Sequence, residues 1–163
     1  MESTNNVSII TKINNLPSEL DDYIKRVYQF IGNVILLGNS LVFRITNLFD
    51  NLKEKYHQDG MLGNKIDMLE KIGYEKLKTS ESSFKNLIVE LKEYNKHLNL
   101  AKHSLFVGNT EIMKTNSSDV LLGDVSKLRI YKFTESEQEK ILDLGSKLNG
   151  DISKIMSTFI GKK

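Results

Sequence analysis

Three histidines are the side chains of this sequence best suited to proton transfer or metal binding. Glu93 and His97 stand four positions apart, so on a helix they share one face and place a carboxylate beside an imidazole. A metal site needs three or four ligands, and this pair supplies two. The chain has no cysteine, which excludes disulfides, thiolate nucleophiles and cysteine-based zinc sites. We therefore predict no catalytic, cofactor-binding or metal-ligating residue, and we expect His57, His97 and His103 to be surface polar side chains.

A second chemical motif is Gly-Asn-Lys-Ile-Asp at residues 63–67, which resembles the guanine-specificity motif of GTPases. In that family the motif lies on a loop that follows a buried strand. Here a polar turn at 57–60 precedes it, and the sequence contains no Gly-x-x-x-x-Gly-Lys-Ser/Thr phosphate loop. We expect the start of a helix at this place, and an enzyme or nucleotide-binding domain is the least favoured interpretation.

The strongest pattern is an apolar heptad seam that begins after the only proline, Pro17. Apolar residues alternate in steps of four and three over more than four heptads, with Gly38 at the one empty position, as is typical of a coiled-coil-like helix. The pattern predicts a long helix over 17–58, about 60 Å in length at about 1.5 Å per residue. We assign the following seam residues to an interaction face: Ile24, Val27, Ile31, Val34, Leu41, Ile45, Leu48 and Leu52.

Residues 27–43 of this helix carry no charge, although 27% of the chain is charged. Three sides of the helix are apolar there, and the fourth is a stripe of small polar residues that recurs every seven positions. This small polar stripe consists of Gly32, Asn33, Asn39, Ser40, Thr46 and Asn47. Burial by the chain's own helices, by partner helices or by lipid would each explain the run. A membrane-spanning helix needs about 20 apolar residues, and asparagines are costly in lipid, so the membrane is the least favoured of the three.

A second helical stretch is expected over 61–103, after the turn at 57–60. Gly73 and the Thr-Ser-rich cluster at 79–83 predict an interruption or kink in it. Its later half resumes the four-three spacing, with lysine and glutamate on the other face. An antiparallel hairpin with the first helix is the simplest arrangement.

The pattern changes to short apolar triplets between turn signals at 104–133, which predicts a β-hairpin or tongue. Ile130 and Tyr131 are adjacent apolar residues, so a single period-two face fails at that step, a mismatch that a bulge would absorb. Residues 134–161 are expected to form a C-terminal helix, opened by a Thr-x-x-Glu capping box. Asn-Gly at 149–150 is a candidate break in this helix.

Together these patterns predict a mainly α-helical fold. We expect a single elongated domain over 1–163, in which a flexible N-terminal segment, 1–16, precedes the first helix. The architecture is a long coiled-coil-like hairpin or bundle of three main helices with a short β excursion.

The composition narrows the function. There are 23 basic and 21 acidic residues, interspersed, with no basic stripe that carries interleaved aromatics, so a nucleic-acid partner is not expected. We expect a non-enzymatic structural or interaction protein without a cofactor, assembling through its long helix as a homo-oligomer or with a helical protein partner. The alternative is a membrane-active or pore-forming protein that inserts residues 27–43. The sequence lacks a signal-peptide pattern, and its Asn-, Lys- and Ile-rich usage is typical of an AT-rich genome, such as that of a virus, a phage or a low-GC bacterium. A cytoplasmic or virion-associated location follows as an expectation.

Overall fold

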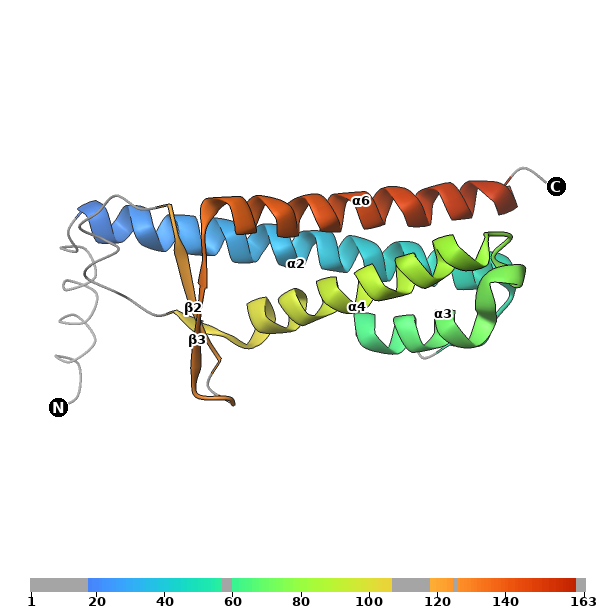
Figure 1. Cartoon of the computed structure of the whole chain (residues 1–163), viewed down its shortest axis with the longest axis horizontal. Coiled ribbons are helices and arrows are strands. Elements are labelled where there is room, and N and C mark those ends of the chain that lie inside the picture. Colours follow the sequence, from blue (N-terminus) through green and yellow to red (C-terminus); the bar gives the residue numbers. More distant parts are fainter. Residues whose placement is uncertain (1–17, 57–59, 107–117, 125, 161–163) are drawn as a thin grey trace, which may run out of the picture.

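Three long helices lie side by side, and a shorter one packs against two of them, in the part of the chain that the computed structural model describes (Figure 1). The described residues are 18–56, 60–106, 118–124 and 126–160. The helices are α2 (Ser18–Leu52), α3 (Leu62–Lys76), α4 (Glu81–His103) and α6 (Glu135–Ile160). The chain passes along α2, returns along α4 and runs forward again in α6, so α4 is antiparallel to its two long neighbours (Figure 1). The predicted mainly α-helical class is confirmed, while the N-terminal segment 1–16 lies outside the described residues.

Helix α2 ends earlier than the heptad pattern suggests. Lys53 has a φ of 55°, in the left-handed region, and its amide donates to the carbonyl of Asp50 at 3.1 Å. The amide of Glu54 then donates to the carbonyl of Phe49 at 3.0 Å, which satisfies a second carbonyl of the last turn. The helix expected over 17–58 therefore stops at Leu52, because this cap turns the chain away from the helix axis.

The stretch expected as one interrupted helix, 61–103, is two helices that fold back on each other. Gly73 has a φ of 79° and Lys78 a φ of 53°, so the backbone leaves the helical region twice. The hydroxyl of Ser80 then accepts a hydrogen bond from the amide of Ser83 at 3.2 Å and caps α4. The interruption predicted at these residues is thus a complete reversal, and α3 packs against α4.

The predicted β excursion is a small antiparallel sheet at one end of the bundle (Figure 1). It contains β1 (Leu105–Phe106), β2 (Val120–Asp124) and β3 (Arg129–Phe133), with β2 in the centre. The β2–β3 register is continuous from Val120 opposite Phe133 to Asp124 opposite Arg129, so these two strands contain no bulge. The mismatch at Ile130 is resolved by exposure instead. Ile130 points outward, while Tyr131 is half-buried and Phe133 is buried.

The sheet is attached to the bundle through α2 and α4. The backbone amide of Leu121 donates to the hydroxyl of Tyr23 on α2 at 3.1 Å. The rings of Phe30 and Phe133 lie 5.6 Å apart, and burial of such rings stabilises the junction. The N-terminal half of α2 is therefore covered by the β-hairpin on its inner side.

Helix α6 opens with the predicted capping box and continues without a break. The amide of Thr134 donates to the carboxylate of Glu137 at 2.8 Å, and the amide of Glu137 donates to the hydroxyl of Thr134 at 3.3 Å. Asn149, a candidate break in the sequence, has a buried side chain. Its amide donates to the carbonyl of Leu37 on α2 at 3.2 Å, which links the two helices.

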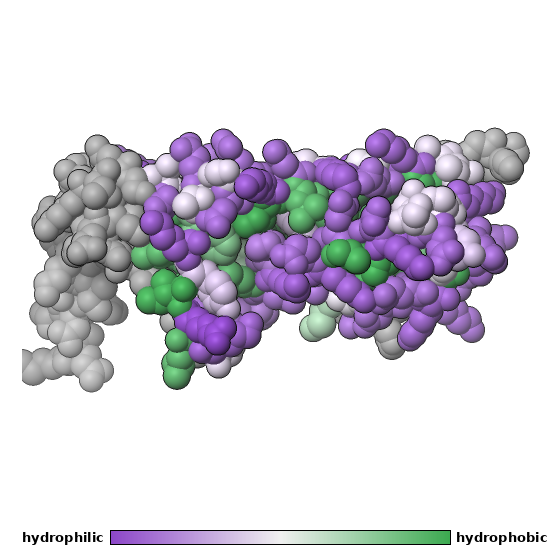
Figure 2. Space-filling model, viewed as in Figure 1, coloured by the Kyte–Doolittle hydropathy of each residue, from purple (hydrophilic) through white to green (hydrophobic). Residues whose placement is uncertain are grey.

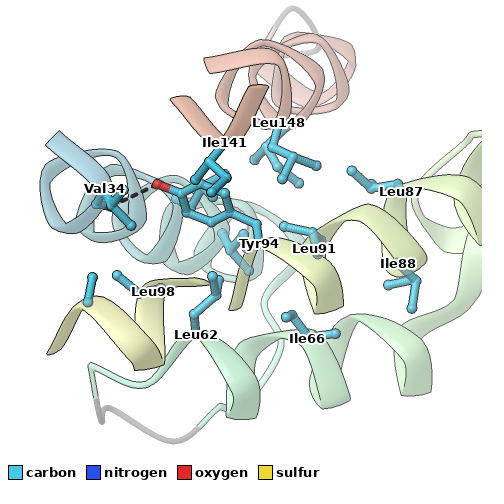
Figure 3. Packing of buried hydrophobic residues seen from close by; sticks show 14 of the residues in the cluster. Val34, Leu62, Ile66, Leu87, Ile88, Leu91, Tyr94, Leu98, Ile141 and Leu148 are labelled. Carbon is cyan, nitrogen blue, oxygen red and sulfur yellow. Dashed lines mark hydrogen bonds between the residues drawn. The ribbon is translucent and has the colours of Figure 1, made fainter. Parts of the chain in front are cut away.

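Tyr94 is the residue around which the three long helices meet (Figure 3). Its side chain is fully buried, and its hydroxyl donates to the carbonyl of Val34 at 2.7 Å. Its ring lies against Gly145, where an added Cβ would come within 2.7 Å of the ring. Gly38 has the same role opposite Leu98, since a Cβ there would lie 2.6 Å from that side chain. The gap in the heptad seam is therefore a place where α2 and α4 approach each other closely.

Candidate interaction surface on helix α2

The residues that the sequence assigned to an interaction face lie in the chain's own core. Val27, Val34, Leu41, Ile45 and Leu48 are at most 1% exposed, covered mainly by α4 and α6. The remaining three members of the seam, Ile24, Ile31 and Leu52, are half-buried. In this fold the seam packs helices of one chain together, so its side chains are not available to a partner.

The opposite side of α2 presents a second apolar surface, which faces solvent. Tyr28, Leu36 and Phe43 are 66%, 68% and 65% exposed, and they follow one another along one side of the helix. Gly32 and Asn39 lie between them and are also exposed. We call these five residues the outer face. Large apolar side chains that stand in a row on a solvent-facing helix mark an interaction site more often than scattered ones do.

The small polar stripe overlaps this outer face and shares Gly32 and Asn39 with it. Gly32, Asn33 and Asn39 are exposed, whereas Ser40, Thr46 and Asn47 are half-buried. An added Cβ at Gly32 would meet no atom within 4 Å, so the backbone there is open to close approach. The stripe therefore does not fill the core. It lies at the surface, where small side chains allow another helix to come near.

Charged residues stand at both ends of the outer face. Near the start of α2, Lys25 forms ion pairs with Asp21 at 2.6 Å and with Asp22 at 3.8 Å. The bond to Asp21 raises the pKa of the Lys25 ammonium above its usual value. Near the end of α2, Asp50 is exposed, and Lys53 is exposed just beyond it. Acidic and basic groups thus alternate around an uncharged centre.

The first charge after the uncharged run does not enter the outer face. Arg44 is half-buried and reaches across to α6, where it donates to the hydroxyl of Ser153. Its Nε also donates to the hydroxyl of Ser40 at 3.4 Å. The guanidinium therefore links α2 to α6.

A shallow groove of about 460 Å³ lies beside Phe43. Its walls come from α2, from the segment after it and from α3: Asn39, Val42, Phe43, Thr46, Tyr56, Gly60 and Lys65. Lys65 is buried, and its ammonium lies 4.6 Å from the centre of the Tyr56 ring. The groove gives the outer face a concave margin along one side.

The other exposed surfaces differ from the outer face. The face formed by α6, α4 and α3 is largely hydrophilic (Figure 2). Val89 on α4 is 66% exposed, and Leu128 and Ile130 are exposed on the β-hairpin. Leu121 and Leu122, part of the apolar tongue seen in the sequence, are buried. Only α2 combines a row of large exposed side chains with a long uncharged segment, among the described residues.

The chemical motifs of the sequence lie elsewhere. Segment 63–67 is the first part of α3, where Lys65 is buried and Asp67 is exposed. The Nε2 of His97 lies 3.5 Å from a Glu93 carboxylate oxygen, and burial lowers the pKa of the imidazole although Glu93 opposes this. His97 and His103 both line a hollow of about 660 Å³ between α4 and the β-hairpin.

No group of three or more His, Asp or Glu side chains is placed to hold a metal ion within the described ranges. His57 lies outside those ranges. The predicted absence of catalytic, cofactor and metal residues stays a prediction.

One helix of the described chain is long and apolar enough to cross a membrane, judged by length and composition alone. It is the Leu20–Leu52 part of α2, and 28% of its most apolar window is buried in this fold. The core helix of a water-soluble protein can pass the same test. This property therefore keeps the membrane alternative open without favouring it over helix pairing.

Comparisons of the chain with protein-family models, with curated proteins and with solved structures found no match. Sequence periodicity identified α2 as the informative helix but selected its inner side. The exposed residues Tyr28, Leu36 and Phe43 were not assigned to that predicted face, although they were detectable as apolar positions outside the seam in a stretch without charge.

Proposed function

We propose that this protein is a non-enzymatic assembly protein that binds another helix through the outer face of α2. The observation that carries the proposal is the row of three large apolar side chains, each about two-thirds exposed, on a segment without charge. Full burial of one such side chain stabilises a complex by about 1.5–3 kcal/mol. Aromatic anchors depleted of neighbouring charge are typical of the centre of a protein interface.

The small residues of the outer face favour a helix as the partner. Gly32 and Asn39 alternate with the large side chains, so the surface has knobs separated by hollows along the helix axis. Another helix fits such a surface by placing its own side chains in the hollows. The half-buried Ile35 and Val42 extend the apolar area on one flank. A second copy of the chain or a helical protein of another kind would satisfy this geometry.

Sedimentation velocity with outer-face and control variants tests the proposal. We expect the wild-type chain to sediment as an oligomer and Leu36→Asp to sediment as a monomer with unchanged helix content. Val89→Asp is the matched control, because Val89 is 66% exposed and lies on α4. The control should assemble like the wild type. An oligomer that survives Leu36→Asp, or that Val89→Asp also dissolves, would remove the outer face as the assembly surface.

The second candidate function is membrane insertion of α2, favoured by its spanning length and low charge. For this function the helix would have to leave the bundle, because Val34 and Leu41 are buried in the core. Release of a dye from liposomes measures it directly. We expect no release from the wild-type chain. Release that Phe43→Lys abolishes would support insertion and replace the assembly proposal.

A further inference from the structure

We propose that the occupant of the outer face is a second copy of this chain, bound with the two α2 helices antiparallel. This inference rests on the proposed function, and it adds the identity of the partner and the register of the contact. The two-fold axis would cross the helices level with Leu37 and Gly38. A two-fold contact uses the same surface on both copies, so the surface has to be complementary to itself.

The sizes of the side chains meet this requirement. When Phe43 of one copy lies level with Gly32 of the other, Leu36 lies level with Asn39. Phe43 and Leu36 then each face a small residue, and the same holds after exchange of the two copies. The space over Gly32 is open, since an added Cβ would meet no atom within 4 Å, and an aromatic ring can enter it. The interdigitation of large and small residues is what close helix packing requires.

The charges at the two ends select the antiparallel orientation. In the same register, Lys25 of one copy lies level with Asp50 of the other. A parallel pairing in register would instead place each of these charges beside its own equivalent. Opposite charges across an interface favour one orientation, and like charges disfavour the other. Lys25 already pairs with Asp21 at 2.6 Å and is exposed, so these contacts determine orientation more than affinity.

The size of the surface indicates a weak dimer. Tyr28 and Phe43 are about 22 Å apart along the helix at about 1.5 Å per residue. A fully buried aromatic side chain removes about 150–250 Å² from water. Tyr28, Leu36 and Phe43 are each about two-thirds exposed at present, so burying them on both copies would remove of the order of 600–1,000 Å² in total. Stable interfaces usually bury about 1,200–2,000 Å² in total. The dimer should therefore dissociate on dilution, and its mass has to be followed over a wide range of concentrations.

Crosslinking through introduced cysteines tests the orientation, since the chain has none of its own. In the antiparallel register the two Asn39 positions are offset by about 4.5 Å along the axis, and the two Gln29 positions by about 25 Å. A short bismaleimide should therefore join Asn39→Cys chains and leave Gln29→Cys chains single. Both positions are exposed, so neither substitution disturbs the core. A parallel pair in register would be crosslinked at both.

Charge reversal at the ends supplies the second arm. Lys25→Glu and Asp50→Lys should each raise the dissociation constant about 2- to 30-fold, because the dimer contains the Lys25–Asp50 pair twice. The double variant restores opposite charges and should return the constant to within about twofold of the wild type. Circular dichroism of each variant checks that the helices remain formed.

The possible results separate this inference from the function on which it rests. A dimer that Leu36→Asp dissolves, with crosslinks at Asn39 alone and rescue by the double charge reversal, supports the antiparallel pair. A dimer that Leu36→Asp dissolves but that is crosslinked equally at Gln29, or is not rescued, overturns the antiparallel pair and leaves the outer face as an assembly surface. A chain that stays monomeric up to millimolar concentration overturns the second copy as the occupant and leaves a helical protein of another kind as the partner of the outer face. A chain that binds neutral phosphatidylcholine vesicles as a monomer replaces both proposals with the membrane alternative.

Discussion

Gly145 lies where α6 touches the ring of Tyr94, and its substitution by alanine measures how tightly the three long helices are packed. The new Cβ would lie 2.7 Å from Cε2 of Tyr94 and 2.9 Å from its Cζ and hydroxyl. The ring cannot move away easily, because it is fully buried and its hydroxyl is bonded to the carbonyl of Val34. Overpacking of this kind costs about 1–3 kcal/mol. Alanine also favours the helix over glycine by about 0.8–1.0 kcal/mol, so Gly145→Ala alone contains two opposed effects.

Gly150→Ala on the same helix separates these effects. Gly150 is exposed, and a Cβ there would meet no atom within 4 Å, so this variant should gain the helix propensity without the clash. We expect the free energy of unfolding of Gly145→Ala to lie about 1–3 kcal/mol below that of Gly150→Ala. Urea unfolding followed by circular dichroism, at one protein concentration for both, gives the difference.

A double-mutant cycle assigns the cost to the Tyr94 ring. In a Tyr94→Leu background the side chain near Gly145 is shorter, so the penalty of Gly145→Ala should shrink by at least half. If Gly145→Ala is as stable as Gly150→Ala, then α6 does not lie as close to the Tyr94 ring on α4 as the structure shows. If the penalty persists unchanged in Tyr94→Leu, the clash does not involve the ring.

Three further changes test single contacts of the bundle. Tyr94→Phe removes the hydrogen bond to the Val34 carbonyl and keeps the ring, so urea unfolding should show a loss of about 0.5–1.5 kcal/mol; no loss would mean that the bond contributes nothing. Thr134→Ala removes the hydroxyl that caps α6 through the amide of Glu137, at a cost of about 0.5–2 kcal/mol by the same measurement, and Thr134→Ser should retain most of the stability. Burial lowers the pKa of His97 from its ordinary value of 6.5, so the folded chain binds fewer protons than the unfolded chain just below that pH. Stability should therefore fall as the pH drops from about 6.5, and His97→Gln should flatten this part of the profile; an identical slope in the variant would contradict the assignment.

The fold was largely readable from local patterns. The capping box at Thr134 and Glu137 forms as predicted, because its hydrogen bonds involve residues three apart and no distant part of the chain. The β-hairpin was also readable from its turn signals. The reversal between α3 and α4 was not distinguished from a kink, because Gly73 and the serines after it indicate only that the helix stops. The direction that the chain then takes depends on packing between helices.

The candidate site could be located only to one helix. A heptad seam records that α2 packs against other helices, and the same residues would appear whether those helices belong to one chain or two. The structure shows them within one chain, since Val34 and Leu41 are buried by its own helices. Gly38 illustrates the same limit. Its place in the seam was visible in the sequence, but its partner, Leu98, is 60 residues away.

Burial of the seam by the chain itself explains only the inner side of the uncharged run. A helix that served the core alone could carry charges on its solvent side without cost, and α4 does so at Lys92, Glu93 and Lys96. Over residues 27–43, α2 carries none, and it exposes Leu36 and Phe43 there instead. Exposed apolar side chains lower solubility, and charges on the same side would impair close contact with another apolar surface. The outer side of α2 is therefore the part of the run that burial within the chain leaves unexplained, and the absence of charge there is what the proposed contact with a partner would require.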